Sequence, residues 1–269
     1  MSFCSQAILA TDLDGTLIPL DGNPEQQQDL QILGQSLEEN SIPLIFVTGR
    51  HLQSVEKAQH EFRLPEPDWV ICDVGSTICR RNATGKLEPL HEYAKHQYEI
   101  VKACPRTDIL QHASKIPGLR EQEAFKQGPY KISFYADQHQ LHEIEQKLLE
   151  FLEDQQIPWS LICSVDPFNG DGLVDLLPQN ISKAYALKWW AEFAGYEDSQ
   201  IVFAGDSGND YAAFVSGFRA ILVNNTNPKI VEKVAQEHQR LGFTDRMYHA
   251  KSSATSGVLE GCRAFQLFD

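Results

Sequence analysis

Short, almost wholly apolar segments recur along this chain, and most of them end in polar loops rich in Asp, Thr, Gly and Ser. Runs of this kind are typical of strands that are buried on both faces, as in parallel sheets. The predicted strands are 7–10, 43–47, 69–72, 200–204 and 220–223. Segments with helical spacing of apolar residues lie between and after them, at 27–40, 52–62, 181–193, 211–216 and 228–242. Because alternating strands and helices are joined by right-handed crossovers, the pattern predicts an α/β core with a parallel sheet.

The middle of the chain has a different pattern. Residues 131–135 alternate like a strand with one exposed face, 139–155 have the spacing of an amphipathic helix, and 159–165 are predicted as another strand. We therefore expect a smaller α+β cap domain, inserted into a Rossmann-like core and covering the carboxyl edge of its sheet. The expected bounds are 1–84 and 172–269 for the core and 85–171 for the cap.

Composition argues against several kinds of partner. The formal net charge is -14, and a chain this acidic is poorly suited to hold nucleic acid or an anionic membrane surface by general electrostatic attraction. No apolar stretch is long enough to span a bilayer, and the first residues do not resemble a signal peptide. Six cysteines without a CxxC pair favour reduced thiols and a cytoplasmic protein. An anionic substrate would need a metal ion or a few placed cations.

Two carboxylates follow the first predicted strand in the segment DLDGT at 12–16. A spacing of two residues directs Asp12 and Asp14 toward one side of an extended chain, and Gly15 permits a sharp turn beyond them. Like charges this close need a cation or a shared proton. Taken alone, an Asp-rich turn or a helix N-cap is the alternative interpretation.

A second acidic loop, GDSGND at 205–210, follows the strand predicted at 200–204. Taken alone, a polar turn with an N-cap at Asp210 would explain it equally well. Open α/β sheets bind ligands beyond the carboxyl ends of their strands, and Mg²⁺ prefers oxygen ligands. Together, the two loops predict a magnesium site that draws on Asp12, Asp14 and Asp206.

Two further elements could hold a phosphate group. The segment TGR at 48–50 ends a predicted strand and opens a helix, where a hydroxyl and free N–H groups can bind phosphate, although a simple Thr cap is the plainer explanation by itself. Lys183 opens another helix and could act as a point charge, although a lone lysine is usually only solvated.

This ordered set of DxDGT, TGR, lysine and GDSGND resembles the four motifs of the haloacid dehalogenase (HAD) superfamily. The α+β insert is similar to the C2-type cap of its IIB branch. The segments DVGSTI at 73–78 and VDLLP at 174–178 resemble those of sucrose-phosphate phosphatases. One departure is KAY at 183–185, where that group usually has Lys-Gly.

The resemblance implies a Mg²⁺-dependent phosphatase. Asp12 would be the nucleophile that forms an aspartyl-phosphate, and Asp14 would act first as general acid and then as general base. The other implied roles are metal binding by the Asp12 carboxylate, the Asp14 carbonyl and Asp206, phosphate binding by Thr48, Gly49 and Lys183, and orientation by Asn209 and Asp210. Arg50 would contact the substrate or pair with a surface acid.

The resemblance points to sucrose 6-phosphate or a related glycosyl phosphate as substrate, and to a glycosyltransferase or synthase as its supplier. A general IIB phosphatase of hexose phosphates or other small metabolites is an alternative. A non-catalytic sugar-phosphate-binding module is a further one, but such a module should have lost a motif acid, and none is missing here. The polar cap residues carry no motif that names the sugar; they include Asp137, Gln138, His139 and Asn169.

Overall fold

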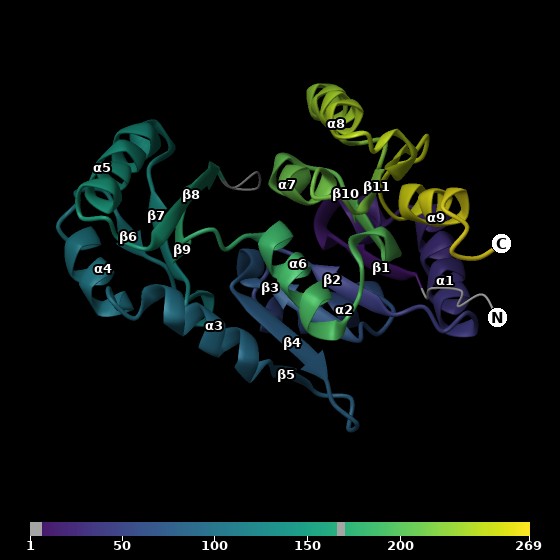
Figure 1. The fold of residues 1–269 in the computed structure, drawn as a ribbon, viewed down its shortest axis with the longest axis horizontal. Coiled ribbons are helices and arrows are strands. Elements are labelled where there is room, and N and C mark those ends of the chain that lie inside the picture. The colour runs from purple at the N-terminus through teal and green to yellow at the C-terminus, as the bar shows by residue number, and fades with distance from the viewer. Residues whose placement is uncertain (1–6, 166–169) are drawn as a thin grey trace. The chain divides into compact units, whose positions relative to one another are not determined.

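The computed structural model describes residues 7–165 and 170–269, which leaves Asn169 outside the described residues. The chain forms two compact units (Figure 1), a core that runs up to Glu88 and resumes at Lys183, and a cap that comprises Pro89–Ser182. The expected cap bounds of 85–171 are therefore wrong at both ends. At the first, β5 (Leu87–Pro89) extends the core sheet. At the second, β9 (Gly172–Pro178) pairs along its whole length within the cap sheet.

The core contains an eight-stranded sheet with the order β12-β11-β10-β1-β2-β3-β4-β5. Its parallel strands are β1 (Ile8–Thr11), β2 (Leu44–Val47), β3 (Trp69–Cys72), β10 (Ile201–Gly205), β11 (Arg219–Leu222) and β12 (Met247–His249). The antiparallel strand β4 (Thr77–Arg81) pairs with β3 and lies beside β5. This topology confirms the α/β core and its parallel sheet.

Helices cover both faces of the core sheet. They are α1 (Pro24–Glu39), α2 (Leu52–Phe62), α6 (Lys183–Ala194), α7 (Tyr211–Phe214), α8 (Pro228–Leu241) and α9 (Ala254–Ala264). One face, with Val202 among its buried side chains, packs against α1, α2 and α9. On the other face, Phe203 meets Phe214 of α7 with ring centroids 5.6 Å apart, and Trp69 meets Trp190 of α6 at 5.8 Å. Burial on both faces explains why these strands are almost wholly apolar.

The cap contains a four-stranded antiparallel sheet, which confirms the predicted α+β insert. Its order is β6-β7-β9-β8, with β6 (Arg120–Glu121), β7 (Ile132–Ala136) and β8 (Trp159–Val165). Its helices are α3 (His91–Val101), α4 (Arg106–Ala113) and α5 (Leu141–Asp154). Ile132 and Phe134 pack into the cap's own apolar core, whereas the intervening Ser133 donates a 2.5 Å hydrogen bond to Asp175. No helix in the described part of the chain is long and apolar enough to cross a membrane.

Candidate active site

The strand ends that carry the acidic motifs are neighbours in the core sheet. Thr11 of β1 pairs with Phe46 of β2 on one side and with Ala204 of β10 on the other. The N–H of Asp12 donates to the Ala204 carbonyl at 2.9 Å. Parallel pairing therefore brings Asp12 and Asp206, which are far apart in sequence, to the same edge of the sheet.

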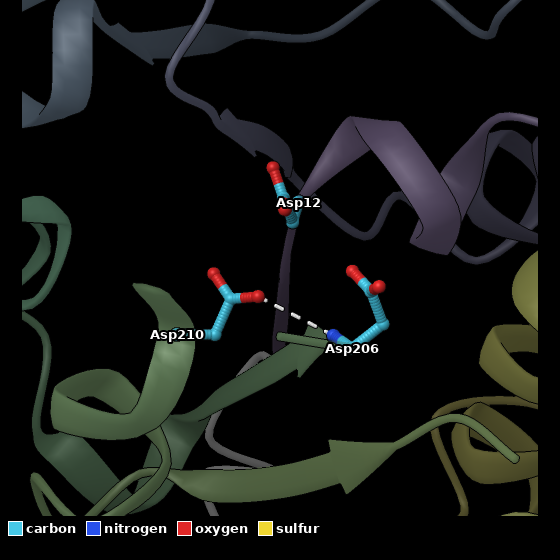
Figure 2. A group of neighbouring side chains, drawn as sticks. All are labelled: Asp12, Asp206 and Asp210. Atoms are coloured by element: carbon cyan, nitrogen blue, oxygen red, sulfur yellow. Dashed lines mark hydrogen bonds between the residues drawn. The ribbon is translucent and has the colours of Figure 1, made fainter. Parts of the chain in front are cut away.

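Asp12, Asp206 and Asp210 surround one small space (Figure 2). One carboxylate oxygen from each lies within 4.8 Å of the others. Asp12 and Asp210 are buried, and Asp206 is partly exposed. The Oδ2 atom of Asp210 accepts hydrogen bonds from the Ser207 hydroxyl at 3.0 Å and from the Asp206 N–H at 3.3 Å. Asp210 thus stabilises the conformation of the loop that follows β10.

Lys183 is the cation of this cluster. Its Nζ lies 3.0 Å from Asp12 Oδ1 and 2.9 Å from Asp210 Oδ1, and the residue is only 5% exposed. Burial alone would lower the pKa of this lysine, but the two carboxylates raise it above its ordinary value. The ammonium is therefore charged, and it links the end of β1 to the loop after β10.

The cluster carries more negative than positive charge. Burial raises the pKa of Asp12 to about 7, although Lys183 acts to lower it. Burial also raises the pKa of Asp206 to about 6, against the effect of a 2.9 Å hydrogen bond from the Thr16 hydroxyl. Three carboxylates around one ammonium form an oxygen-rich, anionic site, and such a donor set suits a hard divalent cation such as Mg²⁺.

Two glycines allow the acidic loops to approach each other. A Cβ atom at Gly205 would lie 2.8 Å from Asp210 Cγ, and one at Gly15 would lie 2.6 Å from Asp206 Oδ2. Gly15 also has a φ of 72°, a left-handed value that side chains disfavour. Gly205 is therefore favoured by space alone, and Gly15 by space and by turn geometry.

The TGR segment lies beyond the end of β2. Thr48 is buried, and its hydroxyl accepts the N–H of Arg50 at 3.2 Å. The Arg50 side chain pairs with Asp14, with Nε 2.7 Å from Oδ2 and Nη2 2.6 Å from Oδ1. The acid with which Arg50 pairs is therefore a residue of the same site. Asn209 lies exposed in the turn before Asp210.

Residues outside the four sequence motifs hold the loop after Asp12 in place. The Asn225 side chain donates to the Gly15 carbonyl at 2.8 Å, and the Thr255 hydroxyl donates to the Leu17 carbonyl at 2.7 Å. Asn225 follows the last predicted strand in a polar segment, NNT at 224–226. That position, at the same sheet edge as the acids, was the signal that could have identified it.

The fold and the site define an HAD-like hydrolase. A putative HAD-like hydrolase of Nitrosococcus oceani is 32% identical over 96% of this chain and 71% of its own length. The match of the sucrose-6F-phosphate phosphohydrolase family covers residues 5–266. The chain belongs to this family.

Two further similarities support the assignment. The chain is similar to the sucrose-phosphatase of Synechocystis sp. PCC6803, solved in complex with sucrose and phosphate, with a TM-score of 0.75, 29% identity and coverage of 97% of this chain and 98% of that one. It is also 28% identical to the mannosylfructose-phosphate phosphatase of Agrobacterium fabrum over 97% of each chain. The protein is thus an HAD-superfamily phosphatase.

Proposed function

We propose that this phosphatase hydrolyses sucrose 6-phosphate or a closely related glycosyl phosphate through an aspartyl-phosphate on Asp12. The observation that carries the proposal is the buried Asp12, which lies 3.0 Å from the charged Lys183 and has an oxygen within 4.8 Å of one from Asp206. A buried carboxylate beside a cation site is placed to attack a phosphoryl group whose charge that site neutralises.

The carboxylates of Asp12 and Asp206, with the main-chain carbonyl of Asp14, would hold the magnesium ion. Asp210 contributes indirectly, because its oxygens are engaged by Lys183, Ser207 and the backbone of the loop. When bound, Mg²⁺ supplies neutralising charge to the nucleophile and to the phosphoryl oxygens.

In the first half-reaction, an Asp12 oxygen bonds to phosphorus while the bond from phosphorus to the sugar oxygen breaks. Asp14 gives its proton to the departing oxygen. In the second, a water oxygen bonds to phosphorus, the bond to Asp12 breaks, and Asp14 takes the proton of the water. After the second step, Asp12 is again a free carboxylate and Asp14 is again protonated, so the cycle closes.

The remaining polar groups of the site would orient the phosphate. Thr48, the Gly49 N–H and the Lys183 ammonium would bind phosphoryl oxygens. Asp210 orients Lys183 through its 2.9 Å contact, and Asn209 would complete the shell around the metal.

The substrate class also indicates what precedes this reaction. A phosphorylated disaccharide or glycoside is formed by glycosyl transfer to a phosphorylated acceptor, so a glycosyltransferase or synthase would supply it. We place both enzymes in the cytoplasm. The free thiols of the described cysteines, which are Cys72, Cys79, Cys104, Cys163 and Cys262, are compatible with that compartment.

The test is a phosphate-ester panel that contains sucrose 6-phosphate, mannosylfructose phosphate and glucose 6-phosphate, assayed with magnesium and with EDTA. The highest kcat/KM is expected on a glycosyl phosphate, with activity lost in EDTA. Asp12→Asn should lower kcat by about four orders of magnitude or more, as expected for removal of a nucleophile.

Asp245→Asn is the matched control, because Asp245 is an exposed acid away from the site, and it should keep full activity. Near-native turnover by a folded Asp12→Asn protein would overturn the proposed function. A higher kcat/KM on glucose 6-phosphate than on either glycosyl phosphate would contradict only the substrate assignment.

A further inference from the structure

The carboxylate of Asp14 is gripped by a single side chain. The guanidinium of Arg50 meets it with two parallel hydrogen bonds, one of 2.7 Å and one of 2.6 Å. Such a fork fixes the plane and direction of a carboxylate as well as its distance. Both hydrogen bonds described for the Asp14 side chain come from Arg50, although that side chain is 51% exposed.

Arg50 is itself held by the elements around it. Its Nη1 lies 3.1 Å from the Ser54 hydroxyl of α2. The main-chain N–H of Arg50 donates to the Thr48 hydroxyl at 3.2 Å, and the main-chain carbonyl of Arg50 accepts the Asp73 N–H at 2.9 Å. Hydrogen bonds therefore hold both the main chain of Arg50 and the end of its side chain. A guanidinium held in this way can fix the orientation of the Asp14 carboxylate.

Asp14 needs such a partner. It lies just before Gly15 in the turn after Asp12, where its backbone leaves the helical conformation with φ -72° and ψ 124°. A half-exposed carboxylate on a turn samples several rotamers unless it is bound. General acid–base catalysis requires the group within hydrogen-bond reach of the proton it transfers.

We propose that Arg50 is a positioning residue that sets the orientation of the Asp14 carboxylate for proton transfer to the leaving sugar oxygen. This inference rests on the proposed function of Asp14 as the proton donor. Arg50 then acts through Asp14 and makes no essential contact with phosphate. Two other roles are distinguishable from it, a direct contact with the phosphate and a surface ion pair without catalytic effect.

The leaving group separates these roles. A sugar alkoxide needs a proton as it departs, whereas p-nitrophenolate is a stable anion that departs without one. We expect Arg50→Ala to lower kcat/KM about 10- to 100-fold on the best sugar phosphate of the panel, within the range of general acid catalysis. On p-nitrophenyl phosphate the loss should stay within about threefold, and the Ki for inorganic phosphate within about twofold, because phosphate binding is unchanged.

A double-mutant cycle on the sugar phosphate gives the second readout. If Arg50 acts only through Asp14, Arg50→Ala should cost almost nothing further in an Asp14→Asn background, since coupled residues are not additive. Ser54→Ala, which removes the brace, should lower kcat/KM in the same direction by a smaller factor. Arg240→Ala is the control, because Arg240 makes the same fork to Glu237 on the surface of α8 and should leave activity unchanged.

Parallel losses on both esters with a raised Ki would overturn the inference in favour of phosphate contact. Multiplicative losses in the cycle, or a fully active Arg50→Ala protein, would also overturn it. Should Arg50→Ala not fold, Arg50→Lys and Ser54→Ala carry the same comparisons. Asp12→Asn is assayed alongside: if it is inactive while the cycle is multiplicative, the inference about Arg50 fails and the proposed function stands.

Discussion

Lys183 lies between two buried carboxylates, 3.0 Å from Asp12 and 2.9 Å from Asp210. All three residues are at most 5% exposed. When one partner of a buried ion pair is removed, the charge of the other stays buried without an opposite charge. The loss in free energy of unfolding is therefore larger than for a surface pair. Lys183 therefore contributes to the stability of the core in addition to its proposed role in phosphate binding.

We expect Lys183→Met to lower the free energy of unfolding by about 3 kcal/mol in the presence of EDTA, the cost of breaking a buried ion pair. Urea denaturation, followed by tryptophan fluorescence, measures it. Lys188→Met is the matched control on the same helix. It removes a 3.2 Å pair with Asp198 that is over 40% exposed at both partners, so its loss should stay below about 1 kcal/mol. Equal losses in the two variants would refute the role given to Lys183.

Sequence reasoning at the residue scale succeeded where a motif fixes both the residue and the element that carries it. The proximity of Asp12, Asp206 and Lys183 follows from three segments that end or begin neighbouring elements. The grip of Arg50 on Asp14 did not follow, because a side-chain partner depends on rotamers and on the relative height of two loops. The sequence left Arg50 with two alternatives for that reason.

Among the elements, α9 is tied to the loop that precedes it through Glu260. The Glu260 carboxylate accepts the N–H groups of Lys251 and Ser252, each at 3.0 Å, and the Tyr248 hydroxyl at 2.7 Å. The same loop ends at Ala254, whose N–H donates to the Asn225 side chain. Glu260 thus stabilises the loop before α9. That loop positions Asn225, which in turn bonds the turn after Asp12.

Glu260 should make stability depend on pH. Burial alone would raise its pKa, but the hydrogen bonds outweigh it and lower the pKa below the ordinary value of 4.5. A carboxyl group with a lowered pKa in the folded state stabilises the protein at pH values above its ordinary pKa. That stabilisation is lost as the pH falls through the pKa of the folded state.

We therefore expect Glu260→Gln to lower the free energy of unfolding by about 1 kcal/mol near pH 7, once solvent screening is allowed for. The difference from the parent protein should shrink below about pH 4. Urea titrations at the two pH values measure it, with Glu232→Gln at an exposed position as control. A difference that stays constant with pH would contradict this account of Glu260.

The predictions of secondary structure were accurate for the buried central strands and poor for the strands at the edges of the sheet. The helix 52–62 and the strands 69–72 and 159–165 agree with the structure at both ends, because apolar runs and turn residues bound them. Strands β4, β5 and β12 were not predicted, since they are short or carry charged residues at the sheet margin. Residues 172–178 were assigned to the core and no strand was predicted there; pairing with β7 and β8 makes this segment strand β9 of the cap sheet.

The whole molecule consists of a discontinuous core and a contiguous cap, each with its own apolar cluster. The chain leaves the core after β5 and resumes it at Lys183, the first residue of α6. The site is thus assembled from the two separate segments of the core, one supplying Asp12 and the other Lys183 and Asp206. Alternating strand and helix patterns predicted this core, whereas the sugar that the enzyme selects has no comparable signal in the sequence.

This assembly would make Asp12 the nucleophile that attacks phosphorus, and the rest of the proposed mechanism depends on that role. The most direct measurement is rapid quenching of the enzyme during turnover of the best sugar phosphate, with borohydride reduction and peptide mass spectrometry. An aspartyl-phosphate is reduced to homoserine, so the account predicts homoserine at position 12. It should be enriched in Asp14→Asn given p-nitrophenyl phosphate, because that leaving group needs no proton while the second step lacks its base. Homoserine at another acid, or none at position 12 in an Asp14→Asn protein that still releases p-nitrophenolate, would contradict it.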